Sequence, residues 1–205
     1  PGFAAAWDRW LQAGLQDSRT HLGQQWGDCY LNAPIWRFAL APGLCGDRAI
    51  LGILMPSVDS VGRYFPFSIT QEVGAMWAAA WAVAEASGWF DRLERVALAG
   101  LNDNLGPEKM DGLLADCLFP CLPESGNSNG FHVAANAERM ARDSAQTTSG
   151  SVLEYLLLSG SPVVERSLER QGIWWQCHRG GGKIIRRCSY LGPDLFTSLL
   201  KREGN

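Results

Sequence analysis

The chain has 205 residues and a net charge of −3; apolar residues make up 46% of it and charged residues 19%. A chain of this length can bury a substantial core as one large domain or two small ones, and its apolar content argues against disorder over most of its length. It contains no long run of Lys and Arg, so its charge pattern does not favour nucleic-acid binding.

The first predicted element is an amphipathic helix. Its apolar residues recur at helical spacing and share one face, which carries Phe3, Trp7, Trp10, Leu11 and Leu15. The opposite face is polar and carries Asp8, Arg9, Gln12 and Gln16. Residues 19–33 have a mixed pattern from which no element is assigned. The chain begins with this helix and shows no signal peptide.

Three strands are expected next, at Ile35–Leu40, Ala49–Met55 and Tyr64–Thr70. In the first of them, Trp36, Phe38 and Leu40 should share one face of a sheet, because side chains alternate along a strand. The second is continuously apolar, which is typical of a strand buried on both faces. The connections are too short for crossover helices, so the three strands should pair antiparallel.

A helical region is predicted over residues 72–100, with Thr70 as its N-cap and Gly88 as a point where it divides. Another helix should open at Gly106-Pro107, because proline is tolerated in the first helical turn, and should end at Pro120. Beyond it we expect a loop and a short helix, at residues 123–130 and 152–158.

The last part of the chain predicts a hairpin and a final helix. Strands at Ile173–Cys177 and Ile184–Tyr190 flank three consecutive glycines, Gly180–Gly182, which are typical of a turn. The final helix should begin at Gly192-Pro193. Together the elements predict an α+β fold (an α/β sandwich), with a mainly antiparallel central sheet of about five strands and helices packed on its faces. No linker divides the chain, so a single domain over residues 1–205 is expected.

The sequence offers no convincing metal, cofactor or membrane-spanning motif. Its three histidines are far apart, and its six cysteines form no Cys-x-x-Cys pair, so we interpret them as reduced thiols. The most apolar helical run, residues 75–86, is much shorter than the roughly 20 residues that cross a bilayer. We therefore expect no cofactor, no metal and no membrane insertion.

Catalytic motifs are equally weak. There is no Gly-x-Ser-x-Gly elbow, and the glycines before Lys183 lack the spacing of a phosphate-binding loop. We therefore predict a protein that is not an enzyme and has no catalytic residues. The alternative is a small hydrolase with Ser57 or a cysteine as its nucleophile, which would need a histidine held close to that residue.

The loop between the second and third strands contains the most informative polar residues. In one interpretation it satisfies its own polar groups: Asp59 or Ser57 accepts backbone N–H groups, and Arg63 pairs with Asp59. In the other it is a rigid projection that binds another protein, with Ser57, Asp59 and Arg63 as the presented group. Trp36 or Tyr64 would then be an aromatic anchor. The sequence leaves both interpretations open.

Several motifs together resemble the TagF family of type VI secretion system-associated proteins of Gram-negative bacteria. They are Pro34–Phe38, Met55–Asp59, Gly62–Pro66, Trp7–Leu11, Trp174-Trp175 and the Leu195–Leu200 helix. The resemblance covers most of residues 3–100 and 173–200. Family members usually carry a Gly-Lys-Leu-Pro and Gly-Asp-Phe segment before the first helix, which this sequence lacks.

The resemblance implies a cytoplasmic, post-translational negative regulator of type VI secretion that acts by binding a forkhead-associated scaffold protein. It supplies no catalytic residues to transfer. A structural component of the secretion apparatus remains an alternative, since such a part would be required for secretion whereas a repressor would hold it back. The oligomeric state, the binding surface and the signal that relieves repression are not predicted.

Overall fold

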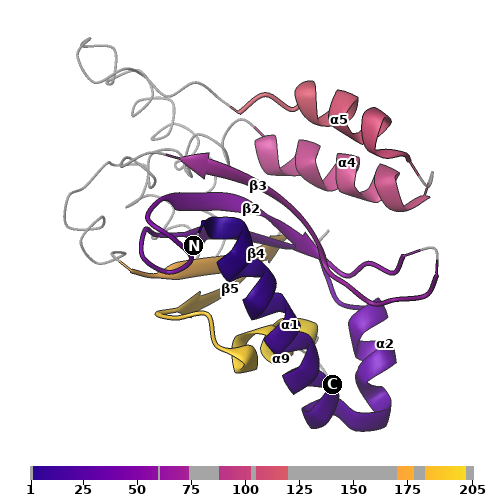
Figure 1. The fold of residues 1–205 in the computed structure, drawn as a ribbon, viewed down its shortest axis with the longest axis vertical. Coiled ribbons are helices and arrows are strands. Elements are labelled where there is room, and N and C mark those ends of the chain that lie inside the picture. The colour runs from indigo at the N-terminus through magenta and orange to yellow at the C-terminus, as the bar shows by residue number, and fades with distance from the viewer. Residues whose placement is uncertain are drawn as a thin grey trace.

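The computed structural model describes residues 2–59, 61–73, 88–102, 105–119, 170–177 and 183–201. The N-terminal elements are α1 (Phe3–Leu22), the 3-10 helix η1 (Gly23–Gln25), α2 (Trp26–Leu31), β1 (Trp36–Leu40), β2 (Ala49–Met55) and β3 (Phe67–Val73). The later elements are α4 (Trp89–Asn102), α5 (Pro107–Ala115), β4 (Gly172–Cys177), β5 (Lys183–Cys188) and α9 (Pro193–Leu200). Figure 1 shows their arrangement.

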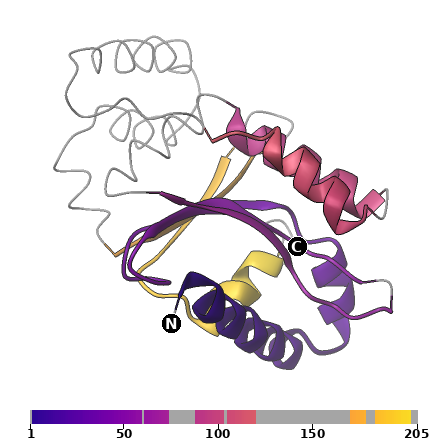
Figure 2. The ribbon, with the colours of Figure 1, turned by 45° about the horizontal axis from the view of Figure 1, so that its top comes forward.

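The five strands form one antiparallel sheet in the order β3-β2-β1-β4-β5. The short connections explain the pairing of β1 with β2 and of β2 with β3. β4 comes from the far end of the chain and pairs with β1, where Phe38 lies opposite Trp174. Helices cover both faces of the sheet, as Figure 2 shows. The predicted α+β sandwich with a five-stranded antiparallel sheet is therefore confirmed.

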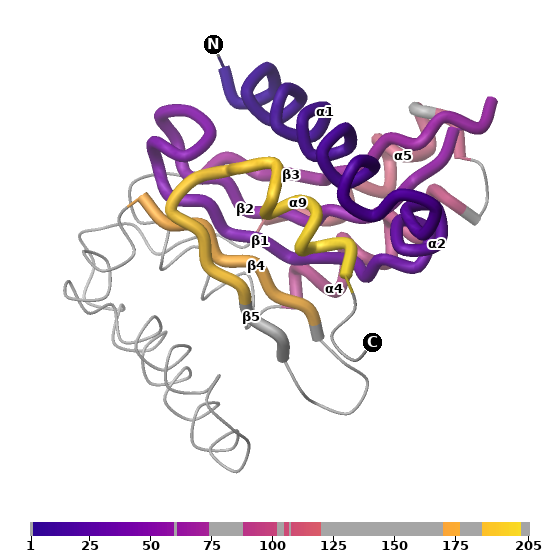
Figure 3. The backbone as a smooth tube through the Cα atoms, turned by 90° about the horizontal axis from the view of Figure 1, so that it is seen from below, coloured from indigo at the N-terminus to yellow at the C-terminus, as the bar shows by residue number. Residues whose placement is uncertain are grey.

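Helices α1, α2 and α9 lie over the same face of the sheet (Figure 3). The core on this face is rich in aromatic side chains. The ring centroid of Trp7 lies 4.8 Å from that of Phe38, and that of Trp10 lies 5.5 Å from that of Trp174. Trp36, Phe38 and Leu40 all contribute to this core, as their alternation predicted. These rings bury a large apolar area in this layer.

Helices α1 and α9 approach each other closely because a glycine stands between them. A Cβ atom added at Gly14 would lie 2.5 Å from the Cβ atom of Phe196. Any side chain at this position would therefore push α9 away from α1. This contact ties the two ends of the chain into the same layer.

Helix α4 packs on the opposite face of the sheet, with α5 beside it. Leu51 and Ile53 of β2 meet Phe90 and Leu93 of α4 in this core. The continuous burial of β2 agrees with the sequence-based expectation of a strand covered on both sides.

The same layer contains a buried arginine. Arg37 of β1 is 6% exposed, and its Nε donates to Glu94 Oε1 at 2.6 Å. A second nitrogen of its guanidinium donates to Asp91 Oδ1 at 2.5 Å. The guanidinium also lies 5.7 Å from the centre of the Phe90 ring. Arg37 therefore fastens the central strand to α4 through charge-assisted hydrogen bonds.

The predicted boundaries of the third strand and of the helical region that follows it were wrong. The third strand begins at Phe67, not Tyr64, and continues to Val73, so Thr70 is a strand residue and not an N-cap. The strand continues because Val73 pairs with Ala49 and is buried against the α4 layer. α4 begins after Gly88, whose φ of +66° favours glycine.

Other elements agree with the sequence or fall outside the described residues. α9 and the two hairpin strands are confirmed, although β5 ends at Cys188 and not at Tyr190. α5 begins at Pro107 as predicted but ends at Ala115, before Pro120, and α1 runs on to Leu22. The predicted loop at 123–130, the helix at 152–158, the Gly180–Gly182 turn and residues 74–87 of the predicted helical region lie outside the described residues. The single domain over residues 1–205 stays a prediction. Within the described ranges, no helix is both long enough and apolar enough to span a bilayer.

Candidate protein-binding surface

The connection between β2 and β3 is a compact projection, here called the 56–66 loop, which leaves the sheet beside α2 (Figure 1). Its two arms are joined by backbone hydrogen bonds: Phe65 N donates to Ser57 O at 3.1 Å and Asp59 N donates to Arg63 O at 3.0 Å. Gly62 has a φ of +83°, a conformation that side chains other than glycine rarely adopt. Apart from Ser60, which lies outside the described residues, the loop is a closed turn.

Asp59 organises the tip of this loop. Its Oδ1 accepts hydrogen bonds from Val61 N at 3.0 Å and Arg63 N at 2.8 Å, while Oδ2 accepts one from Arg63 Nε at 2.6 Å. The hydrogen bonds from the backbone and then the side chain of Arg63 lower the pKa of Asp59. These bonds lie at the surface, because the side chains of Arg63 and Asp59 are 80% and 38% exposed.

Aromatic side chains support the base of the loop. The Tyr30 hydroxyl donates to Ser57 O at 3.0 Å and accepts from Ser57 N at 3.2 Å. The Tyr64 ring packs edge-on against Trp26 and Tyr30, with centroids 5.0 and 5.4 Å away. Burial raises the pKa of Tyr30 to about 12, so its hydroxyl keeps the proton that it donates. These contacts fasten the base of the loop to α2.

Sequence analysis missed Tyr30 and Trp26, because both lie in the stretch with no clear pattern. Their separation of four residues places them on one face of α2, where their rings stack at 5.0 Å. This spacing of two aromatic residues could have predicted that they share a helix face. It gave no hint of the loop, since the contact with Ser57 spans 27 residues of sequence.

The loop presents an arginine between two exposed apolar side chains. Val61 is 72% exposed and Phe65 is 43% exposed, on either side of Arg63. Arginine and aromatic residues are enriched among the residues that dominate protein–protein binding energies. An exposed group of this composition on a preorganised loop is typical of a docking surface.

The structure brings Ser57, Asp59, Arg63 and Tyr64 together in one loop, but not Trp36. Trp36 is 2% exposed, and its Nε1 donates to Leu199 O at 2.9 Å. The prediction of Trp36 as an exposed anchor was wrong, because its position on the central strand points it into the aromatic core. Ser57 contributes through its backbone, and Tyr64 is half-buried as a support.

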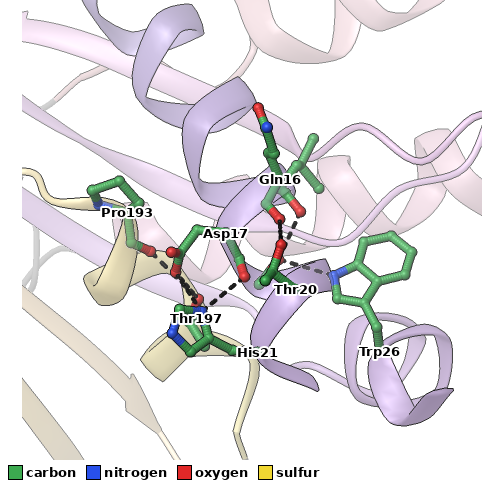
Figure 4. Close-up of polar contacts among 9 residues, drawn as sticks. Gln16, Asp17, Thr20, His21, Trp26, Pro193 and Thr197 are labelled. Carbon is green, nitrogen blue, oxygen red and sulfur yellow. Dashed lines mark hydrogen bonds and ion pairs between the residues drawn. The ribbon is translucent and has the colours of Figure 1, made fainter. Parts of the chain in front are cut away.

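Figure 4 shows the surroundings of His21, a residue relevant to the hydrolase alternative. Its Nδ1 lies 3.3 Å from Asp17 Oδ2, and the Thr197 hydroxyl donates to the same carboxylate oxygen at 2.8 Å. Asp17 thus joins α1 to α9, and Thr197 is only 7% exposed. His21 is engaged here and not at Ser57; the other two histidines, His132 and His178, lie outside the described residues.

Two of the free cysteines that the structure describes, Cys45 and Cys188, do not have the character of nucleophiles. Burial raises the pKa of Cys45 to about 11, and it also raises the pKa of Cys188. Both thiols therefore stay protonated near neutral pH, where a nucleophilic cysteine must be a thiolate. Among the residues that the structure describes, no group of His, Cys, Asp and Glu could hold a metal ion.

The sequence of the chain matches the model of a known protein family. The family model described as the TagF N-terminal domain, type VI secretion system-associated, matches residues 1–117, more than half of the chain. The chain therefore belongs to the TagF family, and the resemblance noted from its motifs is confirmed. The match includes every residue of the 56–66 loop.

The chain is also similar to a solved structure, that of PA0076 from Pseudomonas aeruginosa PAO1. The two share 28% sequence identity with a TM-score of 0.68, and the alignment covers 99% of this chain and 86% of that one. No curated protein matches the chain. The similarity to PA0076 extends beyond the family match to nearly the whole sequence.

Proposed function

We propose that the chain is a non-enzymatic, post-translational negative regulator of type VI secretion. It acts in the cytoplasm by binding a forkhead-associated scaffold component of the secretion system. Membership of the TagF family supports the link to secretion. The observation that carries the mode of action is the 56–66 loop, which offers an exposed Arg63 between Val61 and Phe65.

The hydrogen bonds that order the loop support this mode of binding. Binding costs free energy when flexible segments become ordered, and a segment that is already ordered avoids that cost. Tyr30 holds the base of the loop and Asp59 holds its tip, through five hydrogen bonds in all. A partner can therefore gain contacts with Arg63, Val61 and Phe65 without first ordering them.

Gene deletion separates this role from that of a structural component. Loss of a repressor should raise export of a type VI effector, whereas loss of a required part should abolish it. Complementation with the parent chain should restore repression. Complementation with Arg63→Glu should fail to restore it while the variant accumulates to the parent level. Export that falls on deletion would overturn the proposal.

The proposed partner needs a direct measurement. Purified scaffold component, titrated into the purified chain in a calorimeter, should give a saturable heat that Arg63→Glu removes. Val61→Asp is a second variant, because it changes an exposed residue of the same loop without touching the Asp59–Arg63 pair. Leu118→Asp is a matched control, since Leu118 is 76% exposed and follows α5 on the other face of the sheet. Equal binding by all three variants would contradict the proposal.

A further inference from the structure

A groove runs between α1 and the 56–66 loop, with about 490 Å³ of space. One wall carries Gln12, Gln16, Arg19 and Thr20 of α1, and the other carries Tyr64 and Phe65 of the loop. We call it the α1 groove. It is open to solvent, and it is lined by Phe65, one of the exposed residues to which the proposed function assigns partner binding.

The α1 wall of this groove is a polar row. Gln12, Gln16 and Thr20 follow each other at intervals of four residues, which places them along one helix face. The Thr20 hydroxyl donates back to Gln16 O at 3.1 Å, as Figure 4 shows, and the Gln12 amide donates to Asp8 at 2.8 Å. Such a row suits an extended peptide, whose backbone has unpaired N–H and C=O groups to offer.

Arg19 is the charged residue of the groove. Its guanidinium carbon lies 4.4 Å from the centre of the Trp26 ring, so the planar group is held against an indole while the side chain stays exposed. Within the described ranges, no carboxylate forms an ion pair with Arg19, and the nearby Asp17 is turned to Thr197 and His21. On the loop, Asp59 already offsets the charge of Arg63.

We infer that the α1 groove binds an acidic, extended segment of the partner protein. A carboxylate of the segment pairs with Arg19, whose position over Trp26 restricts the guanidinium before binding. An apolar side chain of the segment packs against Tyr64 and Phe65. This inference rests on the proposed function, because it specifies the chemistry of the partner segment that binds to the same surface. Charge complementarity with Arg19 is the reason for choosing an acidic occupant.

A peptide experiment on the full chain tests the inference. The probe is a short fluorescent peptide of alternating Glu and Leu, and its control has Gln in place of every Glu. At low salt, the acidic peptide should bind about tenfold more tightly by anisotropy than the Gln peptide. Arg19→Gln should remove that difference. Equal affinities of the two peptides, or an unchanged preference in Arg19→Gln, would overturn the inference.

A matched variant checks that the preference for the acidic peptide comes from the groove and not from the overall charge of the chain. Arg48 is 64% exposed and pairs with Glu72 at the far end of the β2–β3 hairpin. Arg48→Gln removes the same charge as Arg19→Gln but should keep the preference for the acidic peptide. If the two variants lose the preference equally, the groove has no special role.

The scaffold titration separates this inference from the proposed function. If the scaffold component binds and Arg63→Glu weakens it while Arg19→Gln does not, the proposed function stands and the groove inference fails. If the scaffold component does not bind but the acidic peptide does so through Arg19, the partner is wrong and the groove inference stands. Loss of scaffold binding in both variants, with falling affinity at higher salt, supports both.

Discussion

Arg37 and Arg63 each form an ion pair through Nε, but in very different surroundings. Each donates from Nε to a carboxylate oxygen at 2.6 Å, Arg37 to Glu94 and Arg63 to Asp59. The Arg37 side chain is 7% exposed and the Arg63 side chain is 80% exposed. Arg37 joins elements that are 57 residues apart, whereas the second pair closes a turn of four residues.

This difference separates residues that stabilise the fold from residues that we propose to bind a partner. A buried charge must be paired, so removing one member leaves the other in a poor environment. An exposed pair is solvated and screened, so its loss changes stability little. The two arginines therefore predict opposite results in stability and binding experiments.

The largest expected effect on stability belongs to Arg37→Met, which fills similar space without charge. The variant should lose about 2–3 kcal/mol of unfolding free energy, less than the loss at a fully buried pair, because the remaining acids are partly solvated. Asp91 and Glu94 keep 65% and 28% exposure. Urea denaturation measures the change, and Arg63→Met is the matched control with an unchanged midpoint. A parent-like midpoint for Arg37→Met would end the distinction between the two arginines.

Alkaline pH should loosen the base of the loop. The pKa of Tyr30 rises to about 12 in the folded chain from the ordinary tyrosine value of 10.0. The unfolded chain therefore loses this proton first, so the contribution of Tyr30 is complete below pH 10 and is lost as the pH rises toward 12. A rise in pKa from 10.0 to about 12 corresponds to roughly 3 kcal/mol.

The stability difference between the parent chain and Tyr30→Phe isolates this effect. That difference should be constant below the ordinary tyrosine pKa and should shrink as the pH rises above it. Chemical denaturation at several pH values measures it, and Tyr190→Phe is the control, because Tyr190 is 63% exposed. If the stability difference stays constant into the alkaline range, the Tyr30 hydroxyl does not make the buried hydrogen bonds to Ser57.

The smallest effect is expected at Asp59 in acid. Because its pKa is lowered in the folded chain, its contribution is present above the ordinary aspartate pKa and is lost as the pH falls through the folded value. Protonation should free the amides of Val61 and Arg63, so their hydrogen exchange should quicken while global unfolding changes little. Asp59→Asn should show that faster exchange already at neutral pH. Unchanged exchange in Asp59→Asn would show that this carboxylate does not order the loop.

Much of the fold could be predicted from local sequence, because hydrophobic periodicity and turn residues report local structure directly. The continuous apolar run Ala49–Met55 matches β2, and Gly106-Pro107 matches the start of α5. The prediction of Thr70 as a helix N-cap was wrong, because β3 pairs with β2 up to Val73 and this pairing outweighs the capping propensity of Thr70.

The candidate site was only partly predictable. The Asp59–Arg63 pair follows from a spacing of four residues within one loop, and the structure contains it. The support from Tyr30 and the burial of Trp36 depend on contacts across 27 and 163 residues of sequence. Single-sequence patterns do not report such distant contacts, so the arginine that faces solvent could not be told from the one that is buried.

The binding affinity of Arg63→Glu for the forkhead-associated scaffold component, measured beside its thermal midpoint, tests the central claim most directly. The claim is that the 56–66 loop is a docking surface whose charged pair contributes little to folding. It predicts an affinity at least about tenfold weaker than that of the parent, with the same thermal midpoint. Undiminished binding, or a variant that unfolds, would contradict it.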